Sequence, residues 1–322
     1  MRRAPWLSGL LAVGCSAFVA CDSPGDRAAS QDASADVATT ADTQGDATDT
    51  ADTTGANESA VCTRWRSDHP VRAEGEWTGS ADACEPGDFL EPGPTNTLRQ
   101  VNLYRWLAGL PDVRLAADKS EAAQACALIM HANRDIEHAV PANWKCVSAA
   151  GKGAAALSNL ATTGAVESID LYMTDQDVAS LGHRRWLLSN TLGPIGVGST
   201  SSFSCLHVLG GDGDARARWV SWPPAGDVPY QAMHIESWMD VDLAGWSIQS
   251  DYIDLRRGDV SVTRNGTTVA VDVWELDPGY GSSFGLGIRP RGWKTAIGDS
   301  YVVDIAGLSE GISWQFDVVD CD

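Results

Sequence analysis

The apolar residues of this chain fall into four blocks of different texture. Trp6 to Val19 form a short, nearly continuous apolar stretch, whereas residues 22 to 60 contain almost no large apolar side chain. From about residue 90 to residue 200 apolar residues recur at helical spacing, and beyond residue 213 they tend to alternate with polar ones. Because helices repeat every 3.6 residues and strands every two, this order predicts helices first and strands afterwards.

Three segments of the middle block have the apolar spacing of helices. The first helix should begin at Thr95, which can cap it, and end before Gly109. A second helix is expected from about Ser120 to about His138, and a third from Ala165 to about Thr174. The middle block is therefore expected to be mainly helical.

The last block contains a strong hairpin signal at Asn265-Gly266. Alternating residues flank this pair on both sides, in 260–264 and 267–273, and a type I′ turn needs positive φ at both of its central positions. Further strands are expected at 301–305 and 314–319. A small antiparallel sandwich of about 110 residues fits this texture best. Four tryptophans could supply its core: Trp246, Trp274, Trp293 and Trp314.

The N-terminus has the three-part logic of an export signal. Arg2 and Arg3 precede the apolar stretch, and Ala20 precedes Cys21 as a small residue precedes the cysteine of a lipoprotein signal. The stretch is shorter than the about 20 apolar residues that span a bilayer. We therefore expect cleavage and lipidation at Cys21, with Cys15 in that role or simple secretion as the alternatives.

Residues 22 to 60 are expected to form a disordered acidic tether, because they cannot bury enough apolar surface to offset the entropy of ordering. Nine acids and one base from Asp22 to Glu58 give −8 of the formal charge of −20, which leaves −12 for the rest. This acidic balance argues against nucleic acid as a partner, because nucleic acid needs basic patches.

Six cysteines follow the tether, and an even number in an exported chain predicts three disulfides. They are Cys62, Cys84, Cys126, Cys146, Cys205 and Cys321. Closeness in sequence suggests that the first pairs with the second, the third with the fourth and the fifth with the sixth, although fifteen connectivities are open. No C-x-x-C spacing occurs, which disfavours a zinc knuckle or a redox centre.

Five segments of the middle block stand in a distinctive order: NLYRWLAGLP (102–111), AAQACALIMHAN (122–133), IEH (136–138), SNL (158–160) and LGHRRWLL (181–188). This order resembles the CAP superfamily, which includes cysteine-rich secretory, venom-antigen and pathogenesis-related proteins and bacterial relatives with SCP-like domains. The resemblance covers roughly residues 90 to 205. It implies an α-β-α sandwich in an exported protein.

The resemblance also implies a central cleft with two histidines and two acids. His138 looks like the first histidine and His183 like the second. The family's first acid falls on Ser158, and only the neighbouring Asn159 matches the family pattern. The second acid falls on Tyr172, with three carboxylates nearby that the sequence leaves open: Glu167, Asp170 and Asp175.

Chemistry at these positions allows more than one interpretation. Two histidines near carboxylates can hold a divalent metal such as Zn²⁺ or share protons, but His138 and His183 have no H-E-x-x-H spacing, so no cofactor is assigned. The alternative is that they hydrogen-bond backbone groups in a partly buried cleft. Arg184 could meet an anionic ligand or pair with a carboxylate. His131, two turns before His138, is more typical of helix packing.

We thus expect an α+β protein: a CAP-like α-β-α sandwich (61–212) and a small all-β sandwich of the immunoglobulin or fibronectin type III kind (213–322), after a signal (1–21) and a tether (22–60). The leading hypothesis is non-enzymatic binding of a lipid, a small apolar ligand or an envelope protein near His138 and His183. A metal- or histidine-dependent extracellular hydrolase or protease, and a structural protein with a vestigial cleft, are the alternatives. The protein should be anchored in the cell envelope, facing the periplasm or the outside, or else be secreted.

Overall fold

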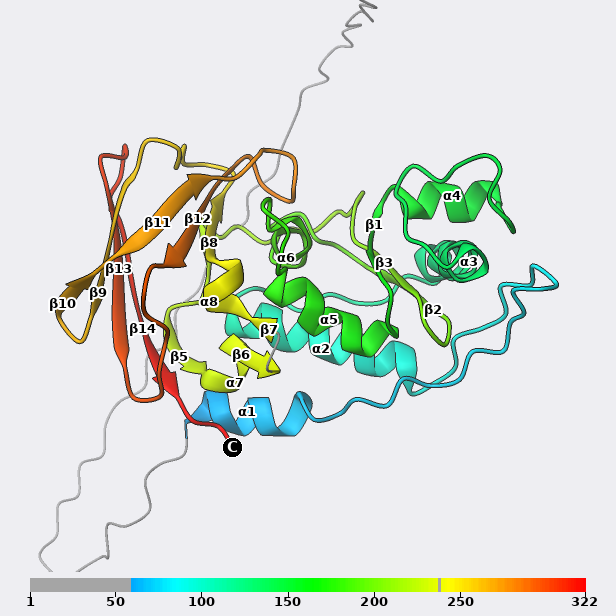
Figure 1. Ribbon diagram of the computed structural model, residues 1–322, viewed down its shortest axis with the longest axis horizontal. Coiled ribbons are helices and arrows are strands. Elements are labelled where there is room, and N and C mark those ends of the chain that lie inside the picture. The colour runs from blue at the N-terminus through cyan, green and yellow to red at the C-terminus, as the bar shows by residue number, and fades with distance from the viewer. Residues whose placement is uncertain (1–58, 237–238) are drawn as a thin grey trace, which may run out of the picture. The chain divides into compact units, whose positions relative to one another are not determined.

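A computed structural model describes residues 59–236 and 239–322, which belong to one compact unit. The signal, the lipidation site at Cys21 and nearly all of the tether lie outside the described residues. No helix within the described ranges is long and apolar enough to cross a membrane. The chain combines helices with several sheets, so the mixed α and β class expected from the sequence is confirmed (Figure 1).

Helices dominate the first part of the chain, and strands dominate the second. The helices are α1 (Ala60–Asp68), α2 (Gly93–Leu107), α3 (Ala117–Asn133), α4 (Ala149–Ala155), α5 (Ala165–Thr174), α6 (Gly182–Leu187), α7 (Tyr230–Met233) and α8 (Val241–Ala244). The strands are β1 (Ser158–Ala161), β2 (Gly196–Ser199), β3 (Ser204–His207), β4 (Val220–Trp222), β5 (Gly226–Pro229), β6 (His234–Glu236), β7 (Met239–Asp240), β8 (Trp246–Ser250), β9 (Asp259–Arg264), β10 (Thr267–Val269), β11 (Val271–Glu275), β12 (Phe284–Pro290), β13 (Ser300–Ala306) and β14 (Ile312–Val319).

The first part of the chain forms three layers around an antiparallel sheet with the strand order β1-β3-β2. Helices α3 and α4 pack on one face of this sheet, and α2 and α5 pack on the other (Figure 1). Gly196 and Gly198 of β2 allow the close approach of α3, because a Cβ at Gly198 would stand 2.1 Å from the Ala123 carbonyl carbon. The small residues of this strand are thus explained by packing.

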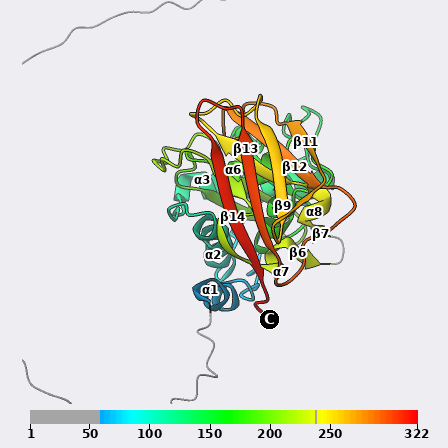
Figure 2. The ribbon, with the colours of Figure 1, turned by 90° about the vertical axis from the view of Figure 1, so that its left-hand side faces the viewer.

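The second part contains two sheets that face each other, as expected for a sandwich. One has the order β10-β9-β13-β14-β5, with β5 parallel to β14, and the other has the order β11-β12-β8-β4. Figure 2 looks onto the first of these sheets, with β14 and β13 in front. Trp246 is fully buried between the sheets, where its ring meets Tyr301 and Phe316 edge-on. Trp314 is also buried, whereas Trp274 and Trp293 are half-buried.

Most local predictions agree with the observed elements. The Asn265-Gly266 hairpin is confirmed, because β9 and β10 pair across it, although the chain then leaves for the other sheet at β11. The second helix is shorter than predicted, since α3 ends at Asn133 and Arg134 takes a left-handed φ of 53°. His138 therefore lies on a loop, and the prediction that it shares a helix face with His131 is wrong.

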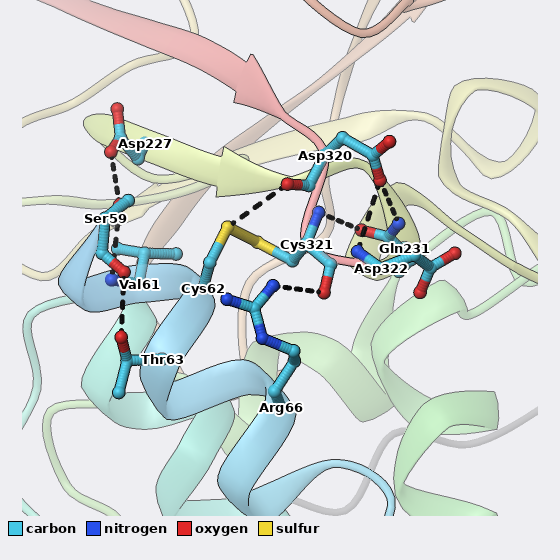
Figure 3. Close-up of a disulfide and its surroundings, with 10 residues drawn as sticks. All are labelled: Ser59, Val61, Cys62, Thr63, Arg66, Asp227, Gln231, Asp320, Cys321 and Asp322. Atoms are coloured by element: carbon cyan, nitrogen blue, oxygen red, sulfur yellow. Dashed lines mark hydrogen bonds between the residues drawn. A yellow bond between two sulfur atoms is a disulfide. The ribbon is translucent and has the colours of Figure 1, made fainter. Parts of the chain in front are cut away.

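All six cysteines form disulfides, but the pairing suggested by closeness in sequence is wrong. The bonds join Cys62 to Cys321, Cys84 to Cys146 and Cys126 to Cys205. The first links α1 to the C-terminal end of the chain, across a sequence separation of 259 residues (Figure 3). Near this bond, Arg66 donates from Nη1 to the Cys321 carbonyl at 2.9 Å. Two segments that are distant in sequence thus meet in space.

The two parts share one hydrophobic core rather than touching at a polar surface. The buried cluster runs from the helices around Tyr104 into the sheets at Trp222, and these two rings meet edge-on with centroids 5.5 Å apart. Arg184 of α6 donates to the Gly245 carbonyl at 2.7 Å, which adds a buried polar connection. The boundary after residue 212 stays a prediction. The shared core shows that the second part is packed firmly against the first.

Candidate functional site

Four of the five residues expected in the cleft line one cavity of about 370 Å³. They come from three different places in the chain, namely the loop after α3, strand β1 and the start of α6. The lining residues are His138, Ala156, Ser158, Asn159, Val178, Ser180, Gly182, His183, Trp186, Leu209, Gly279 and Tyr280. The last two belong to the second part of the chain, and sequence reasoning did not foresee them.

His138 is held by the backbone of α4. Its Nδ1 lies 2.9 Å from the carbonyl oxygen of Ala155, the last residue of that helix. Because a carbonyl oxygen only accepts, Nδ1 must carry the proton. In its neutral form His138 therefore has its lone pair on Nε2.

His183 is held by a buried carboxylate. Its Nδ1 lies 2.7 Å from Oδ1 of Asp175, and the other oxygen of Asp175 accepts the backbone N–H of Arg184 at 3.2 Å. The side chain of Asp175 is 1% exposed and that of His183 is 28% exposed. The ring of Tyr172 stacks on the imidazole with centroids 5.3 Å apart. Carboxylate and ring together fix the imidazole, and its lone pair is again on Nε2 when it is neutral.

Asp175 is the acid that the sequence left open. It lies directly after α5 in a left-handed conformation, with φ of 54°, and this turn aims its carboxylate at the next helix. Asp170 instead binds the Tyr104 hydroxyl at 2.6 Å inside the protein. Glu167 is exposed, and its backbone N–H donates to Glu74. The match to the resembling family points to Tyr172, so this acid could only be found from the geometry of the helix end.

Ser158 and Asn159 are buried in the protein interior beside the cavity. Both are 2% exposed, and Asn159 donates from Nδ2 to the His183 carbonyl at 3.1 Å. This bond uses one of the two N–H donors of the amide and fixes Asn159 to the first turn of α6. Ser158 Oγ is buried and makes no hydrogen bond to the described residues. It supplies no charge where the resembling family has an acid.

Arg184 does not line the cleft, and this part of the site prediction is wrong. Its side chain is fully buried and donates to the carbonyls of Met173 and Thr174 at 2.6 Å each and of Gly245 at 2.7 Å. Burial lowers the pKa of its guanidinium to about 10, partly offset by Asp175. The residue binds neither an anionic ligand nor a carboxylate through its side chain, because three carbonyls from two parts of the fold occupy it.

A second cavity of about 280 Å³ adjoins the first, and both are lined by Val178 and His183. The wall between them is the segment from α5 to α6. Three of its residues that are not glycine have left-handed φ: Asp175 (54°), Asp177 (63°) and Leu181 (48°). Such conformations cost about 1–3 kcal/mol each and persist where the surroundings enforce them. Their concentration around His183 supports a functional role for this segment.

A separate group in the second part could hold a metal ion. A ligand atom from each of His234, Asp240 and Asp242 lies within 4.8 Å of the other two. Within residues 59–236 and 239–322, these three side chains form the one group of at least three potential metal ligands. Neither His138 nor His183 belongs to it. The group is compatible with the divalent metal considered from the sequence, but it lies away from His138 and His183, where that metal was expected.

The hydrogen bonds of this group leave little room for a metal. Asp242 Oδ2 accepts from Thr295 N at 2.7 Å and from Thr295 Oγ1 at 3.0 Å, and Asp242 Oδ1 accepts from Trp246 Nε1 at 2.9 Å. The ammonium group of Lys294 lies 2.5 Å from Asp240. Because this cation already occupies the carboxylate, the donor set fits a structural network better than a metal site.

Comparisons with known proteins leave the family open: no family model matches the chain, and no curated protein matches it.

Proposed function

We propose that this is an exported CAP-like protein that binds a small, largely apolar molecule carrying a hydroxyl or a similar hydrogen-bond donor. The observation that carries the proposal is the cavity in which His138 and His183 meet apolar and aromatic side chains. The ligand's polar group lies at the histidines, and its apolar body lies along Trp186 and Leu209.

The size and lining of the cavity support a small-molecule ligand. Ligand sites typically enclose about 300–1,000 Å³ and combine apolar walls with a few placed polar groups. The main cavity has about 370 Å³, and the adjoining one adds about 280 Å³. Val178, Trp186, Leu209 and Tyr280 supply the apolar surface of the main cavity.

The proton positions on the histidines support a donor on the ligand. Both Nδ1 atoms face acceptors, the Ala155 carbonyl and the Asp175 carboxylate. Each neutral imidazole is then an acceptor at Nε2, and a ligand hydroxyl can satisfy such an atom. Zn²⁺ would use the same lone pairs, so metal content must be measured beside ligand binding.

The three-layer first part supports the likeness to the CAP superfamily, and so does the one cavity lined by the two histidines that the resemblance implies for the cleft. Three disulfides support an oxidising compartment outside the cytoplasm. We further propose anchoring through a lipid on Cys21. In that case Cys21→Ala moves the protein from the membrane fraction to the soluble one, and unchanged partitioning argues against the anchor.

A histidine-dependent hydrolase is the second candidate, favoured by the His183–Asp175 pair. A buried carboxylate that orients an imidazole is the arrangement that makes histidine a general base in hydrolases. Hydrolysis of p-nitrophenyl esters that disappears in both His183→Ala and Asp175→Asn would support this candidate over simple binding.

Ligand binding is tested with dehydroergosterol and cis-parinaryl alcohol, two fluorescent apolar probes that each carry a hydroxyl group. Binding should survive EDTA and weaken at least tenfold in the double variant His138→Ala/His183→Ala, because a hydrogen bond lost at each histidine costs about 1 kcal/mol. His131→Ala, outside the lining of the cleft, is the matched control. Binding that the double variant leaves unchanged, or that EDTA abolishes, would refute the apolar-ligand proposal.

A further inference from the structure

We infer that the loop between β11 and β12 is part of the ligand cleft, and that Tyr280 is a specificity-determining residue that covers the apolar body of the ligand. The inference rests on the proposed function and names the part of the molecule that selects the ligand. It gives the second part of the chain a role in binding beyond that of a spacer.

The loop reaches the cleft from the other part of the protein. Gly279 and Tyr280 line the same cavity as His138, Asn159 and His183. The loop follows β11, which ends at Glu275, and precedes β12, which begins at Phe284. The loop therefore closes one side of a cavity whose other walls come from the first part of the chain.

Two glycines shape the loop around Tyr280. Gly279 has φ of 90° and Gly281 has φ of 79°, values that residues with a side chain rarely adopt. At Gly281 the space is also closed, since a Cβ there would stand 2.6 Å from the Arg185 carbonyl oxygen. Gly279 has open space around it, so its role is conformational. The sequence Gly279-Tyr280-Gly281 thus presents one large aromatic side chain at a fixed place.

Buried bonds from the first part hold the base of the loop. Arg185 is 1% exposed and donates to the Asp277 carbonyl at 2.7 Å and to Ser282 Oγ at 3.0 Å. Ser189 Oγ donates to the Gly281 carbonyl at 2.7 Å. Both donors lie on or just after α6, the helix that carries His183. The loop and the histidine are therefore fixed to the same element.

The ring of Tyr280 lies over the first turn of α6. A Cβ at Gly182 would stand 2.6 Å from Cδ1 of Tyr280, so the ring and that turn are in close contact. The guanidinium carbon of Arg185 lies 5.7 Å from the ring centroid. The side chain nevertheless remains 40% exposed. A large aromatic residue that is firmly placed and yet partly open beside His183 has free surface for a ligand.

Tyr252 provides a matched comparison within the same chain. Arg218 lies 5.7 Å from its ring centroid, the same separation as in the Arg185–Tyr280 pair, and the residue is 52% exposed. Tyr252 does not line the cleft cavity. Substitution of Tyr252 therefore measures how the loss of an exposed tyrosine beside an arginine affects ligand binding in general. Any larger effect of the Tyr280 substitution is due to its position in the cleft.

The first experiment measures dehydroergosterol binding by fluorescence in Tyr280→Ala, Tyr280→Phe and Tyr252→Ala. Tyr280→Ala should weaken binding about tenfold, because a ring face that buries apolar ligand surface is lost. Tyr280→Phe keeps the ring and should stay within about twofold of the wild type, as should Tyr252→Ala. Tyr280→Ala binding equal to that of Tyr252→Ala would overturn the inference.

The second experiment needs no ligand and so separates this inference from the proposed function. Diethyl pyrocarbonate acylates unprotonated imidazole, and mass spectrometry reads its rate at His183. Tyr280→Ala should raise that rate at least fivefold by uncovering the cleft, whereas Tyr252→Ala should leave it unchanged. If the wild type binds neither probe, the proposed function fails while a raised rate still supports Tyr280 as a cover. An unchanged rate in Tyr280→Ala contradicts the inference whatever the probes show.

Discussion

Two histidine–aspartate groups of this protein differ in what their partners leave free. In the cleft, His183 uses Nδ1 on Asp175, and its side chain remains 28% exposed beside two cavities. In the second part, His234 lies 2.8 Å from Thr295 Oγ1 through Nε2 and 3.4 Å from Asp240 through Nδ1. The first imidazole keeps one nitrogen for a ligand, whereas the second has a partner at both.

Residue type alone therefore does not make a binding site. The second group contains more potential metal ligands, yet Trp246, Thr295 and Lys294 already satisfy its carboxylates. A buried polar group that is fully paired stabilises the fold, and one with spare capacity beside a cavity can bind. We therefore expect the group around His234 to stabilise the fold and the group around His183 to bind a ligand.

The largest effect is expected for Asp242→Ala, which should lower the free energy of unfolding by about 4 kcal/mol. The change leaves the buried donors of Trp246 and Thr295 without an acceptor, at about 1–3 kcal/mol each. Urea unfolding followed by tryptophan fluorescence measures it. Asp254→Ala, which removes an exposed carboxylate paired with Arg256, should cost less than about 0.5 kcal/mol. A loss below about 1 kcal/mol in Asp242→Ala would show that the group is not structural.

The second prediction compares alanine substitutions of the two histidines. His234→Ala should lower the free energy of unfolding by about 2 kcal/mol and leave dehydroergosterol binding unchanged, because its side chain is only 13% exposed and bonded on both sides. His183→Ala should weaken binding about fivefold, the equivalent of one hydrogen bond of about 1 kcal/mol. It should cost only about 1 kcal/mol of stability, since Asp175 keeps the backbone N–H of Arg184 and lines the adjoining cavity. Weaker binding in His234→Ala together with the larger loss of stability in His183→Ala would contradict this assignment of roles.

The third prediction concerns the pH dependence of stability through Asp240. Burial alone would raise the pKa of this carboxyl, but hydrogen bonds from His234 and Lys294 outweigh burial and hold the pKa well below its usual range. A depressed folded-state pKa contributes stability above the unfolded pKa of about 3.9, and this contribution is lost as the pH falls below about 4. Asp240 should thus contribute to acid unfolding.

Lys294→Met should reduce the difference between the unfolding free energies measured in urea at pH 5 and at pH 3, because one of the bonds that favour the ionised carboxyl is gone. The exposed Lys152 of α4 makes no ion pair within the described residues, so Lys152→Met is the control. An equal pH dependence in Lys294→Met and the wild type would show that this ammonium does not stabilise the carboxylate.

The smallest effect is expected for metal. Zn²⁺ added to the protein and removed by dialysis should leave no stoichiometric metal on the second group, and His234→Ala should not change the residual content measured by atomic absorption. Lys294 and the hydrogen-bond donors already hold the carboxylates there. One equivalent of Zn²⁺ lost in His234→Ala would contradict the structural interpretation of this group.

Sequence patterns predicted the parts of the site that depend on local order. The resembling motifs predicted that His138 and His183 share a cleft, and both residues line one cavity. Helical spacing predicted α5 with the observed bounds. The acid was left open among three carboxylates because Asp175 turns toward His183 from a left-handed residue after the helix, which sequence spacing does not encode. Arg184 was misplaced because its carbonyl partners include Gly245, which is remote in sequence.

Residue patterns were sufficient to predict the helical and β blocks, the Asn265-Gly266 turn and the formation of three disulfides. Propensity and φ preference act locally, and redox chemistry depends on the number of cysteines. Three features required the folded structure: which cysteines pair, which acid orients His183, and the position of Tyr280 in the cleft. These outcomes depend on packing between residues far apart in the chain, where a shared core and buried hydrogen bonds select one arrangement among many.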